Sequence, residues 1–190
     1  METTTLIIKN MVCGRCIKVV KEELEKLGLS IINISLGEVI IGGTDLPYDK
    51  IKRTLEDNGF ELLENKRAKT IERIKLFVIK FINDDKMLSS GKKFSSQLAH
   101  EMNMDYNYLS SLFSSIEQIT IEQFVILQKI EKAKELLKYG ELTLSEIAYR
   151  LGYSSVNHLS GQFKKVTGMS ASEFKNLTGS SRKPIDKIAE

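Results

Sequence analysis

One stretch near the C-terminal end of the chain, residues 142–176 (LTLSEIAYRLGYSSVNHLSGQFKKVTGMSASEFKN), constrains the fold more than any other. Thr143 precedes Glu146 by three residues, which is the pattern of a capping box at a helix start. Gly152 can adopt the left-handed backbone that ends a helix, and Ser154 can cap a second helix. Apolar residues recur at helical spacing on both sides of this glycine, namely Ile147, Ala148, Leu151, Val156, Leu159, Phe163 and Val166. Two short helices joined by a tight glycine turn predict a helix-turn-helix.

The second helix of this unit has a polar face opposite its apolar stripe. Beginning at the helix start, the face carries Ser155, Asn157, His158, Gly161, Lys164 and Lys165. Hydrogen-bonding groups followed by cations suit the base edges and phosphates of a DNA major groove. A polar face taken alone is more often an ordinary solvated helix surface.

The whole stretch resembles the second DNA-binding half of AraC-type transcription regulators. The residues that carry the resemblance, in the family's order and spacing, are Ile147-Ala148, Leu151-Gly152-Tyr153, Phe163-Lys164-Lys165, Gly168 and Phe174. The resemblance implies sequence-specific binding of double-stranded promoter or operator DNA. Two positions depart from the family. Ala171 replaces a frequent proline, which should only loosen a helix start, and Gly161 stands where a polar or basic side chain often reaches the DNA.

A weaker resemblance to the first AraC-type unit covers residues 94–102 and 105–115, with Asp105 as a helix cap. Its second helix carries neutral candidates for DNA contacts in place of the family's frequent arginines and lysines: Tyr106, Asn107, Ser110 and Ser111. Such a unit either binds DNA weakly or reads it through polar groups alone. The long amphipathic helix predicted over residues 119–139 would join the two units and set their separation, as in the family.

The N-terminal part reads as alternating strands and helices. Strands are predicted at 4–9, 30–36, 38–41 and 60–63, and helices at 17–27 and 48–58. This βαββαβ order is the pattern of a ferredoxin-like fold. The expected fold class is therefore α+β, with this domain followed by an all-α domain that contains two helix-turn-helix units.

The chemistry of the N-terminal domain is expected at Cys13 and Cys16, on the loop that enters the first helix. Backbone N–H groups of the helix start, together with Arg15 and Lys18, favour the thiolate forms. Two thiolates suit a soft ion such as Cu(I) or Ag(I), whereas Zn(II) would need ligands from elsewhere. The same spacing also occurs in thioredoxin-like redox pairs and in buried structural pairs.

The context of the two cysteines resembles the heavy-metal-associated domains of copper chaperones and metal-pumping ATPases. The likeness rests on Met11-x-Cys13-x-x-Cys16 at the first strand-helix junction and on Gly59-Phe60 before the last strand. It implies that Cys13 and Cys16 are metal ligands, that Met11 anchors the loop in the core, and that a copper chaperone or pump is a partner. The motif has no adjacent acidic residue, which favours Cu(I) or Ag(I) over Zn(II).

Charge is distributed unevenly between the two parts. Residues 1–64 contain 8 basic and 11 acidic side chains, a balance of −3, while residues 65–190 contain 20 and 14, a balance of +6. Only the second part has the excess that favours a polyanion. Because no run of about 18 to 20 apolar residues and no secretion signal is present, we expect a cytoplasmic protein that does not enter a membrane. No phosphate-binding loop or catalytic triad is recognisable, so we do not expect an enzyme.

These patterns predict a heavy-metal-associated-like domain at 1–66, a connecting helix at 67–83, a double helix-turn-helix domain at 84–178 that begins with a polar loop over 84–93, and a flexible tail at 179–190. The function expected is a DNA-binding transcription regulator that responds to a soft metal ion. The alternatives are a metal-trafficking or buffering protein and a thiol redox-sensing DNA-binding protein. Monomer and homodimer both stay open.

Overall fold

The computed structural model describes residues 2–176, with the side chain of Ser89 left out. The tail predicted at 179–190 lies outside this range. By its contacts the chain divides into two compact units, one up to Leu76 and one from Phe77 onward. The division falls inside a single helix, so this helix contributes residues to both units.

The first unit contains four strands and two helices that precede the shared helix. Its elements are β1 (Thr3–Lys9), α1 (Gly14–Lys26), β2 (Ile31–Ser35), β3 (Glu38–Gly42), α2 (Tyr48–Asp57) and β4 (Glu61–Leu63). The strands form one antiparallel sheet in the order β2-β3-β1-β4. β1 is central because it pairs with β3 at Thr4 and Ile41 and with β4 at Ile7 and Leu63. The predicted βαββαβ arrangement is confirmed.

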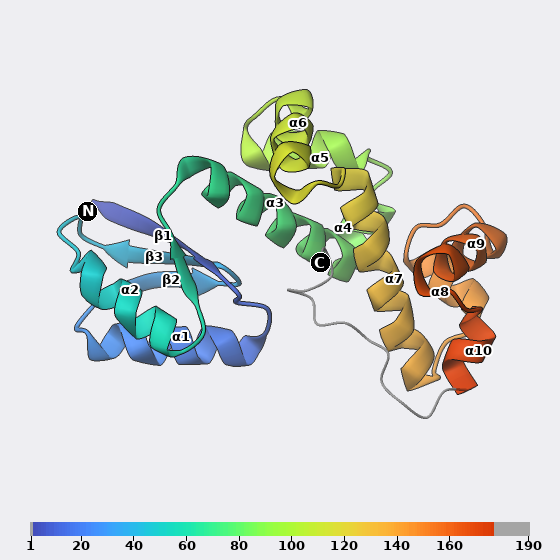
Figure 1. Ribbon diagram of the computed structural model, residues 1–190, viewed down its shortest axis with the longest axis horizontal. Helices are drawn as coiled ribbons and strands as arrows, with labels where there is room; N and C mark the ends of the chain where they lie inside the picture. The colour runs from blue at the N-terminus through green and yellow to red at the C-terminus, as the bar shows by residue number, and fades with distance from the viewer. Residues whose placement is uncertain (1, 177–190) are drawn as a thin grey trace. The chain divides into compact units, whose positions relative to one another are not determined.

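The core of this unit lies between the sheet and the helices α1 and α2, which pack on the same face (Figure 1). Alternation along β1 turns Leu6 and Ile8 toward the helices, since successive strand residues point to opposite faces. The matching helix residues are Val20, Leu24, Ile51 and Leu55, spaced so that each helix buries one stripe. Met11 is 1% exposed in this core, in agreement with its expected role as an anchor beneath the cysteine loop.

The shared helix, α3 (Lys66–Asn83), buries apolar residues along its whole length. Its Leu76 packs on the turn between β2 and β3 at Gly37, which has a φ of 70° and whose added Cβ would lie 2.3 Å from a Leu76 methyl carbon. Its Phe81 belongs to the second unit and makes an edge-on ring contact of 5.0 Å with Phe94. The backbone conformation favours a glycine at position 37, whereas the close contact could be relieved by a movement of the Leu76 side chain.

The second unit is built of helices throughout its described residues. They are α4 (Asp85–Ser89), α5 (Phe94–Met102), α6 (Tyr106–Glu117), α7 (Ile121–Tyr139), α8 (Leu144–Arg150), α9 (Val156–Thr167) and α10 (Ala171–Asn176). The expectation of a loop over 84–93 was wrong in part, because Asp84 caps α4 by accepting hydrogen bonds from the N–H groups of Lys86 and Met87. None of the described helices is both long and apolar enough to cross a membrane.

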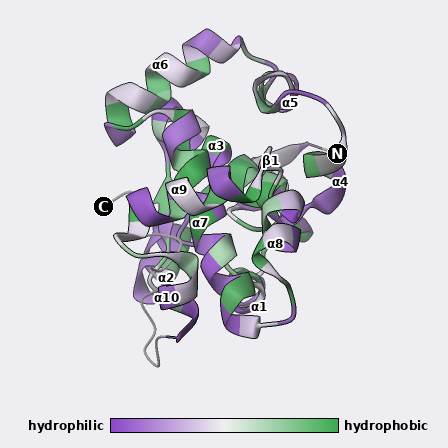
Figure 2. Cartoon of the chain, turned by 90° about the vertical axis from the view of Figure 1, so that its right-hand side faces the viewer, coloured by the Kyte–Doolittle hydropathy of each residue, from purple (hydrophilic) through white to green (hydrophobic). Residues whose placement is uncertain are grey.

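In this unit α7 runs between the α5–α6 pair and the α8–α9–α10 group (Figure 1). Hydrophobic and hydrophilic residues alternate in bands along α6, as an amphipathic helix requires (Figure 2). The predicted α+β class, with a βαββαβ domain followed by an all-helical domain, is therefore confirmed.

Candidate nucleic-acid interface and cysteine pair

The second helix-turn-helix unit, α8 and α9, begins with the capping box expected from the sequence. The Thr143 N–H donates to the Glu146 carboxylate at 2.7 Å, and the Glu146 N–H donates to the Thr143 hydroxyl at 3.3 Å. These contacts satisfy two of the N–H groups that a helix start leaves without an intrahelical partner. The Thr143 N–H, followed by the Thr143 hydroxyl, which donates to the same carboxylate at 2.7 Å, holds the pKa of Glu146 below its ordinary value.

The turn between α8 and α9 depends on Gly152, which has a φ of 68°. The N–H of Tyr153 donates to the Ala148 carbonyl at 2.9 Å, a bond that closes the end of α8. The cap of α9 is Ser155, whose hydroxyl accepts from the His158 N–H at 3.1 Å. The cap was predicted at Ser154, one residue too early, because two adjacent serines are equally good caps by type.

α9 has a buried side and an exposed side. Leu159 and Phe163 are buried, and the Phe163 ring meets Phe174 of α10 edge-on at 5.6 Å. Val166 is 37% exposed and lies outside this core, so its assignment to the apolar stripe was wrong. The exposed residues are Asn157, His158, Gly161, Lys164 and Lys165, and Ser155 at the cap is also exposed. The structure thus brings all six residues predicted on this helix to its accessible surface.

His158 is held in one orientation by neighbours from the turn. Its Nδ1 lies 3.2 Å from the Ser154 hydroxyl, and its ring meets the Tyr153 ring edge-on at 5.3 Å. Lys129 of α7 also contacts Tyr153, with its Nζ 5.1 Å from the ring centroid. Burial lowers the pKa of Lys129 and raises the pKa of Tyr153 to about 12. The start of α9 is therefore supported by α7.

The first helix-turn-helix unit, α5 and α6, is capped by Asp105, which accepts from the N–H groups of Asn107 and Tyr108 at 2.8 and 3.2 Å. On α6 the side chains of Asn107 and Ser111 are exposed and that of Ser110 is half-buried. Tyr106 differs from these, because its hydroxyl donates a hydrogen bond to the Glu122 carboxylate at the start of α7. This bond lowers the pKa of Glu122, while burial raises the pKa of Tyr106.

The helix between the two units, α7, buries polar residues that its amphipathic pattern did not indicate. Gln128, Glu131 and Lys134 are all less than 9% exposed, and the Lys134 ammonium lies 2.6 Å from a Glu131 carboxylate oxygen. The same ammonium is 5.9 Å from the Phe174 ring centroid. Periodicity treats charged residues as surface, so no signal in the sequence pointed to this buried pair.

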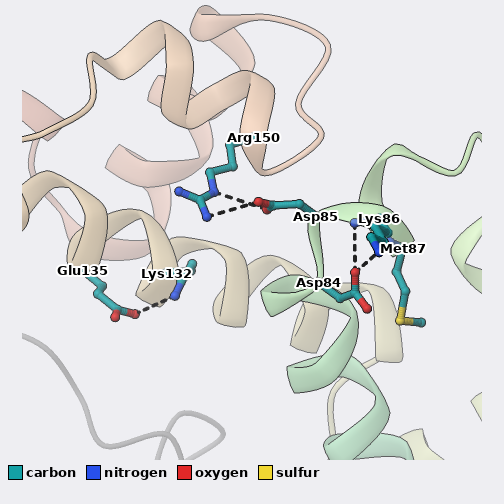
Figure 3. A network of polar contacts seen from close by, with 7 residues as sticks. All are labelled: Asp84, Asp85, Lys86, Met87, Lys132, Glu135 and Arg150. Atoms are coloured by element: carbon teal, nitrogen blue, oxygen red, sulfur yellow. Dashed lines mark hydrogen bonds and ion pairs between the residues drawn. The ribbon is translucent and has the colours of Figure 1, made fainter.

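A contact that no sequence pattern indicated links α4 to α8 (Figure 3). The Arg150 guanidinium donates from Nε and Nη2 to the two carboxylate oxygens of Asp85, each at 3.2 Å. A shallow groove of about 560 Å³ adjoins this pair and is lined by Asp85, Leu142, Ser145, Glu146, Tyr149 and Arg150.

Cys13 and Cys16 are brought together at the start of α1, with their sulfur atoms 3.4 Å apart. Cys13 is exposed and Cys16 is half-buried, and neither forms a disulfide. The Cys16 N–H, followed by the Cys16 thiol and the Arg15 N–H, holds the pKa of Cys13 below its ordinary value. Within residues 2–176, no group of three or more His, Cys, Asp or Glu side chains is arranged to hold a metal ion. The pair can therefore offer two soft ligands without a third from this part of the chain.

Comparison with known proteins finds similarity in the second unit. Residues 98–177 match the family model described as a helix-turn-helix domain. Similar curated proteins include the melibiose operon regulatory protein of Escherichia coli K12, 24% identical over 83 residues that make up 44% of this chain and 28% of that protein. The HTH-type transcriptional regulator YfiF of Bacillus subtilis is 32% identical over 110 residues, which make up 54% of this chain and 34% of that protein.

The chain thus spans about a third of the length of the curated relatives that it matches. Among solved structures, the C-terminal domain of the response regulator AraT from Geobacillus stearothermophilus shares the fold, with a TM-score of 0.51 and 24% identity over 63% of this chain and 95% of that one. The similar curated proteins are named as regulators of transcription or of an operon. Residues 98–177 therefore match a helix-turn-helix domain of the kind that occurs in these regulators, and they follow an N-terminal βαββαβ domain.

Proposed function

We propose that this protein is a cytoplasmic transcription regulator that binds operator DNA through its two helix-turn-helix units and responds to a soft metal ion at Cys13 and Cys16. The observation that carries the DNA-binding half of the proposal is the exposed side of α9. It presents hydrogen-bonding groups at its start and two lysines near its end, on a helix whose other side is buried.

The two ends of this face suit different parts of a DNA duplex. Asn157 and His158 lie in the first turn of α9, where a recognition helix contacts base edges. An asparagine amide can pair with both N6 and N7 of adenine. Lys164 and Lys165 lie in the last turn and suit phosphate oxygens. In the first unit, Asn107, Ser110 and Ser111 add neutral hydrogen-bonding groups, whereas the Tyr106 hydroxyl is already engaged by Glu122.

The metal half of the proposal rests on the two sulfur atoms, which are close enough to share one ion. Two thiolates without further ligands fit Cu(I) or Ag(I), and Zn(II) would lack the four ligands of a closed site. The exposure of Cys13 provides access for a copper chaperone or pump that exchanges the ion. Any coupling to DNA requires that the ion bind with different affinity to two states of the protein. α3 is the candidate for the coupling element because its residues belong to both units.

A second candidate function, a thiol redox switch, is favoured by the same sulfur distance. Two thiols 3.4 Å apart could form a disulfide, and a thiolate-favouring environment at Cys13 would promote the exchange reaction. A reversible Cys13–Cys16 disulfide with a physiological potential would support this function in place of metal sensing.

The test measures binding of the reduced protein to the promoter DNA beside its own gene, with and without one equivalent of Cu(I). The control is the Cys13→Ser/Cys16→Ser variant. We expect Cu(I) to shift the DNA affinity of the native protein and not that of the variant, and the direction of the shift distinguishes activation from derepression. Equal DNA binding in all four samples would contradict metal sensing and leave the redox function. Failure to bind any operator would favour a trafficking or buffering protein.

The assigned DNA face has a separate test in the salt dependence of binding. We expect Lys165→Ala to weaken binding to all sequences about equally and to reduce the slope of log affinity against log salt by about 1, because one phosphate contact is lost. Lys138→Ala, an exposed lysine on α7, is the matched control. An unchanged slope in Lys165→Ala would contradict the assignment of this face.

A further inference from the structure

α4 contacts both helix-turn-helix units, although it is only five residues long. On one side, the Gln97 amide of α5 donates to the Met87 carbonyl of α4 at 3.4 Å and to the Lys92 carbonyl just after α4 at 3.1 Å. On the other side, a Leu88 methyl carbon lies 3.8 Å from the position of an added Cβ on Gly152, at the turn before α9. α4 is thus a second link between the units, in addition to the continuous helix α7.

The polar part of this link is the contact between Asp85 and Arg150 (Figure 3). These residues are 65 positions apart in sequence and meet through two parallel hydrogen bonds of 3.2 Å. A two-point contact between a planar guanidinium and a carboxylate restricts orientation as well as distance. Asp85 stands at the start of α4 and Arg150 at the end of α8, where each charge is also favoured by the dipole of its own helix.

The pair contributes little to the stability of the fold. The two side chains are 46% and 61% exposed, and exposed ion pairs contribute between about 0 and 1 kcal/mol. Its geometric effect is larger, since within residues 2–176 the α8–α9 unit is otherwise held to the first unit only through its packing on α7. A second point of attachment beside the turn that precedes α9 further restricts the orientation of that helix.

We propose that Asp85 and Arg150 are positioning residues that hold α9 in one orientation relative to α6, and so determine which separation of two DNA half-sites the protein prefers. This inference rests on the proposed DNA binding by both units. Neither residue needs to touch DNA for this effect, because the spacing preference follows from the relative placement of the two recognition helices.

The test uses the full chain with the substitutions Asp85→Asn, Arg150→Gln and both together. The matched control is Lys132→Gln, which removes an ion pair of 3.1 Å between Lys132 and Glu135 inside α7 that joins no two units. Each protein selects from a pool of duplexes in which two half-sites are separated by a variable number of base pairs. Its affinity is then measured for the selected operator and for a single half-site.

We expect the wild type to select one spacing, and each single variant to accept neighbouring spacings with a roughly two- to fivefold loss for the best operator. The double variant should match either single variant, because the two residues act through one contact. The affinity of every variant for a single half-site should equal that of the wild type. The Lys132→Gln control should also select the same spacing as the wild type.

Some results would overturn the inference and leave the proposed function intact. One is that all variants select the same spacing of half-sites as the wild type, and another is that the double variant loses as much operator affinity as the two single variants together. A third is that Arg150→Gln alone loses affinity for the single half-site. The last result would make Arg150 a DNA contact. Selection of a sequence by the wild type without any preferred spacing would also overturn it. If the wild type selects no sequence at all, the proposed function fails, and the inference fails with it.

Discussion

Tyr106 shows how one hydrogen bond changes what a recognition helix can offer. By residue type it was a candidate for a DNA contact, yet its half-buried hydroxyl donates to Glu122 at the start of α7. A hydroxyl in this bond fastens α6 to α7 and is not available to a base without breaking the bond. The first unit is therefore left with Asn107, Ser110 and Ser111 as its polar candidates on α6.

The bond between Tyr106 and Glu122 predicts a pH-dependent stability difference. Because it lowers the pKa of Glu122, its stabilisation is complete above the pKa of an unfolded glutamate, about 4.3, and is lost as the pH falls through the lower pKa of the folded state. We expect Tyr106→Phe to lower the free energy of unfolding by about 1 kcal/mol near neutral pH, with the difference shrinking at about pH 3.5. Urea denaturation at both pH values measures this, with Tyr108→Phe as the exposed control. A difference that stays constant with pH would contradict the assigned bond.

At the scale of single elements, α9 contains a glycine that its own structure does not require. Gly161 lies in the helix interior with no atom within 4 Å of an added Cβ. Gly152, in the preceding turn, has a φ of 68°, which side chains other than glycine adopt only with strain.

These two glycines predict opposite effects of the same substitution. Gly161→Ala should stabilise the protein by roughly 0.5 to 1 kcal/mol through helix propensity, whereas Gly152→Ala should destabilise it by about 1 to 2 kcal/mol. Chemical denaturation of the two variants beside the wild type provides the measurement. Equal effects in the two variants would show that position 161 is not in a regular helix, or that position 152 tolerates a side chain.

The buried pair in α7 predicts a strong effect of removing one charge. Lys134→Met would leave the Glu131 carboxylate, 7% exposed, without its cation, so we expect a loss of about 3 to 5 kcal/mol. Glu131→Leu/Lys134→Met should recover most of this loss, since the buried charge is then absent as well. Lys132→Met, in the more exposed pair with Glu135, is the control and should cost less than about 1 kcal/mol. If Lys134→Met unfolds at the wild-type urea concentration, the pair is not buried as described.

At the scale of the whole molecule, two compact units share one helix, and only the first contains the cysteines. A ligand that binds a folded unit stabilises that unit in proportion to the logarithm of its concentration above Kd. The same ligand leaves a unit that unfolds separately unchanged.

We therefore expect two transitions in calorimetric unfolding of the full chain, of which Ag(I) raises only the one that belongs to residues 1–76. At a free Ag(I) concentration a thousandfold above Kd, the free energy of unfolding of this unit rises by about 4 kcal/mol. Binding of Ag(I) to the thiolates of the unfolded chain would reduce this increase. The Cys13→Ser/Cys16→Ser variant should show two transitions that Ag(I) does not move. A single transition that moves as a whole would mean that the two units unfold together through α3.

Local interactions explain most of what could be predicted. The capping box of Thr143 and Glu146, the glycine stop at Gly152 and the apolar stripes of α1 and α2 each depend on residues a few positions apart, and each was found where expected. The close approach of the Cys13 and Cys16 sulfurs has the same origin, because residues three apart at a helix start lie on one side. The five predicted residues within α9 are accessible because the helical period places them away from the buried stripe of Leu159 and Phe163, and Ser155 is accessible at the cap.

Tertiary structure alone decided the contacts between distant residues. The meeting of Asp85 with Arg150, the burial of Glu131 with Lys134, and the use of Tyr106 by Glu122 depend on how α4, α6, α7, α8 and α10 pack. The sequence by itself determined the elements and their faces, since helix propensity, capping and periodicity act within about four residues. Which polar side chain becomes buried or paired depends on the residues that pack against it. Neither spacing nor periodicity along the sequence identifies those residues.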